Sequence, residues 1–365
     1  MTTKHRWENS AMMQAVRCLP TEKIPIWLMR QAGRYMPEYR AMRQRVGFLE
    51  LCKTPALAAE VMLTAVEQLK VDAAIIFSDI LLILEPMGLG LEFLPEGGPR
   101  ITKPITVADD VAKICELHDE SSMEFVMDVV KYTREGLDDH LPLIGFAGAP
   151  FTLAAYAIEG GASRDFQKVK AFMRLHPYEW ADLMKKIALS TARYLNGQIN
   201  AGVQIVQLFD SWVGTLSEEE YREYAMPYTK MIFDLVSRET PMIHFAPGNP
   251  MLLPAIREAG GHVIGVDWRL SIAKAWEMIG ADCAIQGNLD PSVLLTTPET
   301  IRKHVQKILH HVDHRPGFVF NLGHGVLSQT PVENVKILIE TVHEFCSRAG
   351  EPAGLTHHIG ENGPS

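Results

Sequence analysis

Five arginines follow the first apolar segment of the chain and make it locally basic. Arg30 and Arg34 lie four residues apart, with Gly33 between them, directly after the apolar run 24–29. From Arg30 to Arg45 there are five arginines and one acid, whereas the whole chain has a formal net charge of −9. Arginine stays charged and presents a fork of donors that suits carboxylate or phosphate. The segment is therefore either a binding site for a small anion or a solvated, arginine-rich loop.

Two further polar residues stand where apolar segments end. Asp79 lies between two apolar runs, and a carboxylate in such surroundings needs a partner or a function. It belongs either to a site or to a cap of the following turn. His324 lies between Gly323 and Gly325, which permit a tight turn that would bring the imidazole close to a ligand. The alternative for His324 is a turn histidine whose ring lies in water.

Two other patterns indicate function less strongly. The segment 323–328 resembles a dinucleotide-binding loop but lacks its third glycine. His310 and His314 share a helix face and, together with His311, could offer nitrogen ligands to a metal. The sequence has no HExxH motif and no paired cysteine and histidine spacing. Histidines near the C-terminus of a helix, favoured by the helix dipole, explain this group better than a metal site.

Composition excludes several classes of protein. A length of 365 residues and a hydrophobic content of 47% fit one large α/β domain with insertions. The five cysteines are scattered and odd in number, which is typical of reduced thiols in the cytoplasm and not of disulfides or a zinc site. The N-terminus lacks a signal peptide, and no apolar run approaches the ~20 residues of a membrane span. The negative charge argues against general nucleic-acid binding.

Short apolar runs rich in Val and Ile recur along the chain, as expected for parallel strands buried on both faces. The predicted strands are 24–29, 73–78, 142–147, 203–209, 241–246, 262–267, 282–287 and 317–321. Eight strands alternating with helices predict an α/β fold, a single (β/α)8 TIM barrel. A doubly wound sheet is the alternative, because strand order cannot be read from one sequence. We assign the barrel to 1–350 and a flexible C-terminal tail to 351–365.

Threonine before proline marks three predicted helix starts, with the proline in the first helical position. These pairs are Thr54-Pro55, Thr297-Pro298 and Thr330-Pro331. Ser217 with Glu220, and Thr330 with Glu333, have the spacing of capping boxes. These signals place helices between the predicted strands, as a barrel requires.

Polar residues gather where the predicted strands end and not where they begin. The strand ends carry 30–34, 78–79, 148–150, 210–212, 246–248, 267–269, 287–290 and 321–325. In a barrel, the C-terminal ends of all eight strands surround one mouth, where active sites form. The sequence therefore predicts a functional site at this mouth that includes Arg30, Asp79 and His324.

Five motifs, in order, resemble those of the uroporphyrinogen decarboxylase family. They are Met29 to Tyr39 (MRQAGRYMPEY), Ile75 to Leu81 (IIFSDIL), Gly145 to Thr152 (GFAGAPFT), Gln286 to Pro291 (QGNLDP) and Asn321 to Gly325 (NLGHG). The resemblance extends from about Trp27 to the last predicted helix. One segment, 244–248, does not match the pattern of the family closely.

The resemblance implies a (β/α)8 barrel that forms a homodimer and uses neither a cofactor nor a metal. It implies the removal of four acetate carboxyls from uroporphyrinogen III, giving coproporphyrinogen III and carbon dioxide. It assigns catalysis to Asp79, Arg30 and His324, with His324 either an acid or a contact to a substrate carboxylate. The residues that it assigns to substrate binding are Arg30, Gln31, Ala32, Gly33, Arg34, Asp79, Tyr156, Ser211 and His324.

Three other functions compete with this one. Methyltransferases related to this fold use a zinc site with a His-x-Cys element, whereas His244 is followed two residues later by Ala246. A silent binding protein for polycarboxylates would use the arginines equally well, but Asp79 would hinder capture of such a ligand. A nucleotide-binding α/β protein would need a phosphate loop, which the sequence lacks.

Overall fold

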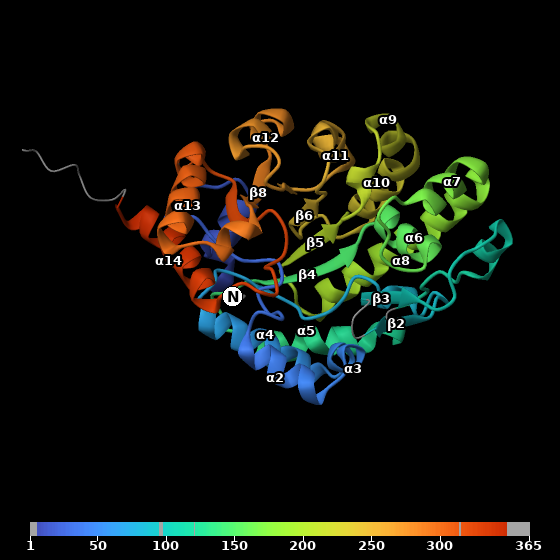
Figure 1. The fold of residues 1–365 in the computed structure, drawn as a ribbon, viewed down its shortest axis with the longest axis horizontal. Helices are drawn as coiled ribbons and strands as arrows, with labels where there is room; N and C mark the ends of the chain where they lie inside the picture. The colour runs from blue at the N-terminus through green and yellow to red at the C-terminus, as the bar shows by residue number, and fades with distance from the viewer. Residues whose placement is uncertain (1–5, 95–97, 120, 314, 349–365) are drawn as a thin grey trace, which may run out of the picture.

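A computed structural model of the chain describes residues 6–94, 98–119, 121–313 and 315–348. Its centre is a parallel sheet in the order β1-β4-β5-β6-β7-β8-β9, surrounded by helices (Figure 1). The strands are β1 (Ala74–Ile75), β4 (Leu143–Gly148), β5 (Ile205–Phe209), β6 (Met242–Phe245), β7 (Val263–Gly265), β8 (Ala284–Leu289) and β9 (Phe318–Leu322). Each overlaps a predicted strand. The predicted tail, 351–365, lies outside the described residues.

The remaining predicted strand, 24–29, joins the two edges of this sheet. Ile26 forms a parallel bridge with Phe320 of β9, and the Pro25 carbonyl accepts a hydrogen bond from Phe320 N–H at 2.8 Å. On the other side, the Ile26 carbonyl accepts from Asp72 N–H at 2.8 Å, just before β1. We call residues 24–29 the closing segment. Because it links the first and last strands of the sheet, the strands form a barrel and not the open sheet of a doubly wound fold.

Side chains from strands that are not neighbours meet inside this barrel. Trp27 Nε1 donates to Gln286 Oε1 of β8 at 2.8 Å, and Gln286 Nε2 donates to Gln207 Oε1 of β5 at 3.1 Å. Since β6 and β7 separate β5 from β8, these side chains can meet only across the barrel interior. The interior is therefore packed with side chains, as is usual for eight strands.

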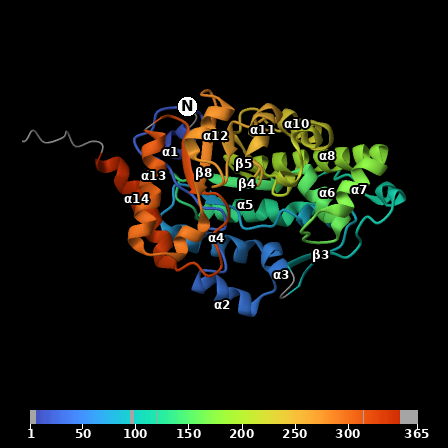
Figure 2. The same ribbon diagram turned by 45° about the horizontal axis from the view of Figure 1, so that its top comes forward.

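Helices cover the outside of the barrel, and in Figure 2 β4 and β5 lie between α5 on one side and α10 and α11 on the other. In α13, Ile301, Val305, Leu309 and Val312 are buried, the stripe expected of a helix packed on one face. The helices are α1 (Ala11–Val16), α2 (Pro37–Arg45), α3 (Phe48–Lys53), α4 (Pro55–Leu69), α5 (Glu124–Gly136), α6 (Pro150–Glu159), α7 (Gln167–Leu175), α8 (Pro177–Ala201), α9 (Glu218–Glu220), α10 (Met226–Leu235), α11 (Leu253–Ala259), α12 (Ile272–Ile279), α13 (Pro298–Val312) and α14 (Val332–Arg348).

Two of the predicted helix caps are confirmed. Ser217 Oγ accepts from Glu220 N–H at 3.1 Å, and Glu220 Oε2 accepts from Ser217 N–H at 3.0 Å, which completes the capping box of α9. Thr297 Oγ1 accepts from Thr300 N–H at 3.4 Å at the start of α13. These side chains satisfy N–H groups that have no partner within the helix.

Of the other two, Thr54 is the N-cap residue of α4 and Pro55 begins the helix, as predicted, but the Thr54 hydroxyl donates to the Glu50 carbonyl at 2.7 Å and does not cap the helix. The capping box predicted at Thr330 is wrong. Helix α14 begins at Val332, and the buried Thr330 hydroxyl has no hydrogen-bond partner in the part of the chain that the structure describes. Glu333 pairs with a lysine one turn further along the helix. Because the Thr330 side chain is buried, it does not cap the N–H groups at the start of α14.

An antiparallel hairpin that the sequence analysis did not predict lies beside α6. It consists of β2 (Leu91–Leu94) and β3 (Gly98–Ile101). Arg100 bridges to Gly161, and Ile101 N–H donates to the Gly160 carbonyl at 2.9 Å, directly after α6. The hairpin strands are short and largely solvent-facing, so they leave no apolar run in the sequence.

The histidines of α13 and the cysteines agree with prediction where the structure describes them. His310 and His311 lie in the last turn of α13, as predicted, whereas His314 lies outside the described residues. Within those residues, no group of three or more His, Cys, Asp or Glu is arranged to hold a metal ion, and four cysteines are free thiols. In the same ranges, no helix is both long and apolar enough to cross a membrane.

Asp72 fastens the closing segment to the barrel. Its Oδ2 accepts from Ile26 N–H at 2.9 Å and lies 2.9 Å from His343 Nε2, while its Oδ1 pairs with Lys23 Nζ. Burial raises the pKa of Asp72, but the hydrogen bonds and charges of His343 and Lys23 outweigh burial and lower the pKa below its ordinary value. The ionised carboxylate is therefore the form that holds the closing segment.

We expect Asp72→Ala to lower the free energy of unfolding by about 3 kcal/mol, because a buried N–H and the side chains of Lys23 and His343 lose their acceptor. Because its folded pKa is depressed, Asp72 contributes stability above the ordinary carboxyl pKa, and this is lost as pH falls through the folded value. Urea denaturation between pH 2 and 7 measures both effects.

Asp128→Ala, which breaks an exposed pair with Lys131, is the control and should change stability by less than about 0.5 kcal/mol. Equal stability of Asp72→Ala and wild type would contradict this role.

Candidate active site

Arg30 directly follows the closing segment, in a backbone conformation that residues other than glycine rarely adopt. Its φ is +63°, which costs free energy and persists only where the surroundings impose it. Met29 is held from two sides, because its N–H donates to Asn321 Oδ1 at 3.2 Å and its carbonyl accepts from Val326 N–H at 3.0 Å. The Arg30 side chain then passes Gly325, where an added Cβ would lie 2.5 Å from Arg30 Cδ. Gly325 thus leaves the space that Arg30 occupies.

Asp79 lies in the turn after β1, close enough to Arg30 for the two charges to interact. Its Oδ1 accepts from Leu81 N–H at 2.9 Å. Desolvation raises the pKa of Asp79 to about 6, while the Leu81 hydrogen bond and the Arg30 charge act in the opposite direction. Burial, followed by the charge of Arg34, lowers the pKa of Arg30. Asp79 is therefore both the cap of its turn and the anionic neighbour of Arg30.

Tyr156 approaches the same pair from α6. Burial raises the pKa of its phenol, and the Asp79 charge adds to that effect, whereas a side-chain hydrogen bond with Trp212 and the Arg30 charge oppose it. The ring centroids of Tyr156 and Trp212 are 5.9 Å apart. Three residues from distant parts of the sequence, Asp79, Arg30 and Tyr156, thus form one group, which we call the Asp79 cluster.

His324 borders the Asp79 cluster beside Arg30. Its Nδ1 accepts from Gly325 N–H at 2.8 Å, and this hydrogen bond assigns the ring proton to Nε2. Burial and the charges of Arg30 and Arg269 lower the pKa of His324, with Asp267 acting in the opposite direction. At neutral pH the ring is therefore uncharged and offers Nε2–H as a donor. Of the two predicted roles, this favours a contact with a carboxylate over that of an acid.

The other predicted residues differ in their exposure. Arg34 is exposed, and its charge reaches Arg30. Gly33 lies in the turn between them, where an added Cβ would come within 2.9 Å of the Arg30 carbonyl oxygen. Ala32 is buried, and Ser211 is half-buried in the loop after β5. The two arginines are thus held by a turn in which a side chain at Gly33 would not fit.

Gln31 is an exception, because its side chain is committed to the core. The side chain is fully buried. Its Oε1 accepts from Leu28 N–H at 3.2 Å, and its Nε2 donates to the Ala73 carbonyl at 3.3 Å. The predicted contact between Gln31 and substrate stays a prediction, and it would have to involve the main chain of Gln31 because the side-chain amide is engaged in the core. The Gln31 amide instead joins the closing segment to the residues just before β1.

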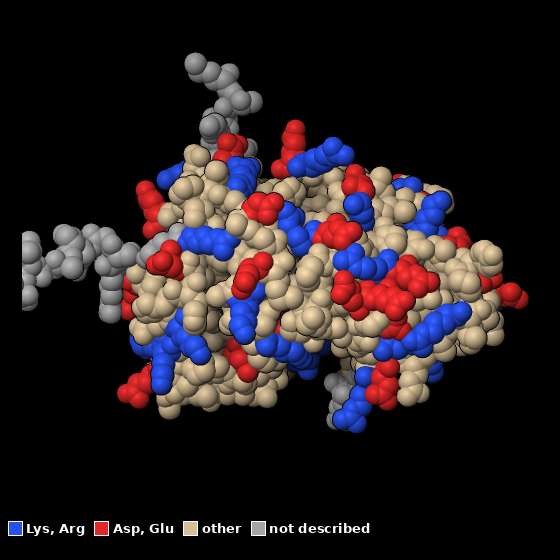
Figure 3. All heavy atoms as spheres, turned by 90° about the horizontal axis from the view of Figure 1, so that it is seen from above, with Lys and Arg blue, Asp and Glu red and all other residues tan. Residues whose placement is uncertain are grey.

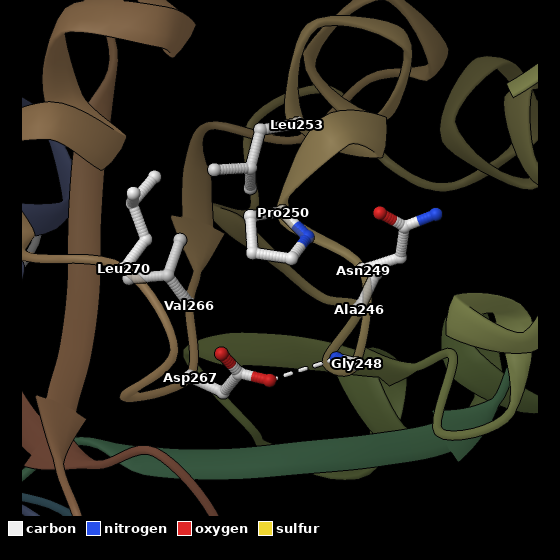
Figure 4. A pocket seen from close by; sticks show the side chains of 8 residues that line it. All are labelled: Ala246, Gly248, Asn249, Pro250, Leu253, Val266, Asp267 and Leu270. Atoms are coloured by element: carbon white, nitrogen blue, oxygen red, sulfur yellow. Dashed lines mark hydrogen bonds between the residues drawn. The ribbon is translucent and has the colours of Figure 1, made fainter.

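Asp267 holds together the loops after β6 and β7. It accepts from Gly248 N–H at 2.8 Å, beside a small pocket walled by Leu253 and Leu270 (Figure 4). It also accepts from Arg269 N–H at 3.0 Å and pairs with the Arg269 guanidinium. The pocket encloses only ≈ 10 Å³, about the room of one water molecule. The segment 246–248, which did not match the family pattern, is thus a wall of the mouth anchored by Asp267.

A larger depression lies on the surface at α9 and has a volume of ≈ 640 Å³. It is lined by Glu218, Glu219, Arg222 and Glu223, a set that would repel the anions that Arg30 and Arg34 suit. On the face shown in Figure 3, basic and acidic side chains lie side by side. This face lacks the continuous basic surface that nucleic-acid binding requires.

Comparison with known proteins places the chain in a family. The family model described as uroporphyrinogen decarboxylase (URO-D) matches residues 8–345. A uroporphyrinogen decarboxylase from Carboxydothermus hydrogenoformans is 49% identical over 94% of this chain and 98% of the relative. The chain belongs to the uroporphyrinogen decarboxylase family. A further uroporphyrinogen decarboxylase, from Trichlorobacter lovleyi, is 46% identical over 93% of this chain and 100% of the relative.

Solved structures with the same fold are more distant from this uroporphyrinogen decarboxylase family member. A methyltransferase from Methanosarcina mazei has a TM-score of 0.74 at 20% identity, covering 93% of this chain and 99% of the other. A B12-independent methionine synthase from a Shewanella species has a TM-score of 0.53 at 11% identity, covering 81% of this chain and 88% of the other. At such low identity these likenesses concern the fold alone.

The methyltransferase alternative would require His244 to reach the mouth, and it does not. The ring is fully buried on the outer side of β6, with Nδ1 3.3 Å from the Gly260 carbonyl and its centroid 5.2 Å from that of Phe233 in α10. Burial lowers the pKa of His244 to about 4. The next residue, Phe245, packs against Phe209 of β5. A histidine directed into the helix layer does not offer a ligand to a zinc ion at the mouth.

Proposed function

We propose that the chain removes the four acetate carboxyls of uroporphyrinogen III as carbon dioxide and so forms coproporphyrinogen III. The observation that carries this proposal is the Asp79 cluster, in which one carboxylate lies beside Arg30 and Tyr156. Simple capture of a polycarboxylate would be served by arginines alone, and a carboxylate among them hinders it. We infer that Asp79 serves, besides Arg30, a positive charge that arises during the reaction. Relatives named uroporphyrinogen decarboxylase at 44% to 49% identity support the same reaction.

The positive partner is a protonated pyrrole. An acetate on a pyrrole resists decarboxylation because the electrons left behind have no acceptor. Protonation of the adjacent ring carbon creates a cation. When the bond to the carboxylate breaks, its electron pair moves into an exocyclic double bond and neutralises that cation. A second proton on the former methylene carbon makes the methyl group, and the ring carbon releases its proton. Each acetate thus consumes one proton and needs no electron acceptor.

Asp79 stabilises the cation by its charge and accepts the pyrrole N–H groups. A flexible porphyrinogen can fold into a dome in which these N–H groups converge on one carboxylate. Because Leu81 N–H occupies Oδ1 of Asp79, Oδ2 is the oxygen that we expect to accept them. A fixed carboxylate that faces a developing positive charge lowers the activation free energy of the reaction, because the carboxylate does not have to reorient as the charge forms.

Arg30 and Arg34 hold substrate carboxylates around this centre. Both offer rigid, charged donors, and because the Arg30 charge acts on Asp79, Arg30 orients the reacting acetate. His324 donates from Nε2 to a further carboxylate. Tyr156 and Ser211 contribute hydroxyl groups at the other side of the cluster. The resemblance also extends this proposal to a homodimer in the cytoplasm, and light scattering on the purified protein tests the dimer.

The pH dependence of kcat/KM should report the ionisation of Asp79. Only the carboxylate can balance a pyrrole cation, and its pKa is raised to about 6. We therefore expect kcat/KM to rise with pH through an inflection near 6 and to fall below it as Asp79 becomes protonated. Stopped anaerobic assays between pH 4.5 and 8.5 measure the profile, and circular dichroism at each pH verifies that the fold persists. An acid limb centred near 4 would contradict the role of a desolvated Asp79.

The proposed function is tested by anaerobic incubation of the protein with uroporphyrinogen III and a metal chelator. Oxidised products are then separated by chromatography. We expect coproporphyrin together with partly decarboxylated intermediates. Unchanged uroporphyrin in the presence of folded protein would overturn the proposal. Activity that depends wholly on added zinc or corrinoid would favour the methyltransferase alternative.

A further inference from the structure

A buried carboxyl and hydroxyl pair lies behind the mouth and takes no part in the proposed chemistry. Asp210 is the first residue after β5, and its Oδ1 accepts from Thr152 Oγ1 of α6 at 3.0 Å. Both side chains are fully buried. Burying polar groups costs free energy unless they are hydrogen-bonded. Burying this pair therefore costs free energy, and a function of the pair would explain why it is present.

The Thr152 hydroxyl makes a second connection to the same loop. It accepts from Trp212 N–H at 3.2 Å, while it donates to Asp210. One hydroxyl thus ties the loop after β5 to the first turn of α6 at two points. Removing it would leave the Trp212 N–H and the Asp210 Oδ1 without these partners.

Trp212 carries this connection to the Asp79 cluster. Its ring lies between Tyr156, at 5.9 Å between centroids, and Phe166, at 5.1 Å. Its side chain also hydrogen-bonds with Tyr156. Thr152 and Tyr156 are four residues apart and so lie on one face of α6. When Thr152 fixes the main chain of Trp212, it also fixes the ring against which Tyr156 rests.

Tyr221, the first residue of a π-helical turn, Tyr221–Ala225, lies close enough to Asp210 for the two to interact electrostatically. Tyr221 is fully buried, and neither its hydroxyl nor Asp210 Oδ2 has a hydrogen-bond partner among the described residues. Burial raises the pKa of Asp210 to about 7, and burial and the Asp210 charge raise that of Tyr221. Turns of this kind are frequent at functional sites. Because Asp210 Oδ2 has no partner among the described residues, the hydrogen bond from Thr152 is the one that orients the Asp210 carboxyl.

We propose that Asp210 and Thr152 are positioning residues for decarboxylation, which fix Trp212 and, through it, Tyr156 in the Asp79 cluster. Ser211 lies between Asp210 and Trp212 in the sequence and is fixed by the same contacts. Neither Asp210 nor Thr152 touches the substrate in this arrangement. The inference rests on the proposed function, because its readout is the turnover of uroporphyrinogen.

Thr152→Val removes the hydroxyl and keeps the shape of the side chain. We expect it to lower kcat about tenfold and to change KM less than twofold, whereas Thr152→Ser, which keeps the hydroxyl, restores kcat to within about twofold of wild type. Thr191→Val in α8 is the matched control, because Thr191 is fully buried and its hydroxyl has no hydrogen-bond partner within the described residues. The control should leave kcat unchanged. Wild-type kcat in Thr152→Val would overturn the proposal.

A double-mutant cycle with Tyr156→Phe separates positioning from a merely structural role. If Thr152 acts through Tyr156, Thr152→Val should lower kcat by less than about twofold once the phenol is absent. A structural role would lower kcat by the same factor in both backgrounds, and that outcome would overturn the proposal. Should Thr152→Val not fold, Asp210→Asn, which keeps an acceptor for Thr152, should retain kcat within about threefold, and a larger loss would count against it. If wild type itself leaves uroporphyrinogen unchanged, the proposed function fails and not this inference.

Discussion

Replacing Asp79 by asparagine should preserve the fold and lower turnover about a thousandfold. The substitution removes the charge but keeps an oxygen that can accept from Leu81 N–H. At ~4 Å and an effective dielectric constant of about 20, the attraction between a carboxylate and a pyrrole cation is ~4 kcal/mol, which corresponds to about three decades of rate. Because the cation develops mainly in the transition state, kcat should fall more than KM rises.

The same substitution should raise stability at neutral pH. The folded pKa of Asp79 is about 6, above the ordinary value of 3.8. Its ionised form therefore destabilises the fold progressively as pH rises through that interval. The full shift corresponds to about 3 kcal/mol, but Asp79 is only half-buried and we expect about 1 kcal/mol for Asp79→Asn. The gain should be present above pH 6 and absent below about pH 4.

Anaerobic single-turnover assays and urea denaturation at two pH values measure these effects on turnover and stability. Asp128→Asn, at an exposed position of α5, is the control and should alter neither. A variant at Asp79 that decarboxylates at nearly the wild-type rate would remove the counter-charge role. Lost turnover with unchanged stability would instead mean that the Asp79 carboxylate is better solvated in the resting enzyme than its raised pKa indicates.

Gly325→Ala should lower kcat/KM about a hundredfold by displacing the Arg30 side chain, although it replaces no side chain of the site. An added Cβ would lie 2.5 Å from Arg30 Cδ and 2.8 Å from Arg30 Cγ. The φ of Gly325 is not in the left-handed region, so alanine suits the backbone. The flexible Arg30 side chain must then turn away from Asp79 and His324. We expect a loss of about 2.7 kcal/mol in transition-state stabilisation and little loss of stability.

The pH profile distinguishes this displacement from general damage to the fold. The Arg30 charge lowers the pKa of Asp79, so moving Arg30 away should shift the acid limb of kcat/KM to higher pH. Gly47→Ala is the matched control, because the nearest atom to its added Cβ lies 3.9 Å away, and its profile should equal that of wild type. An unshifted acid limb in Gly325→Ala would show that Arg30 does not tune Asp79.

Much of the barrel could be predicted because buried parallel strands are continuous apolar runs. The ends of these runs also indicated Asp79 and Arg30, since parallel strands deliver their last residues to one mouth. The hairpin of β2 and β3 was not predictable in this way, because its short strands face solvent. Thr330 was misjudged for a related reason: the sequence shows a capping pattern, but only packing decides whether the side chain stays near the helix N–H groups.

The spacing of residues in the sequence does not predict which way an individual side chain points in a turn. Gln31 lies between Arg30 and Ala32 in the motif, yet its amide bonds to residues below the mouth. Thr152 and Asp210 are 58 residues apart in sequence, and nothing local connects them. Their hydrogen bond depends on β4 and β5 being neighbours, which brings the start of α6 beside the loop after β5.

The closing segment has a consequence for synthesis of the protein. Ile26 pairs with Phe320, near opposite ends of the chain, so Arg30 can reach its final backbone conformation only after β9 has left the ribosome. A nascent chain halted before that point contains Asp79 and Tyr156 but cannot assemble the cluster around them. Contacts between residues this distant in sequence are slow to form. The protein therefore becomes able to bind substrate only late in folding.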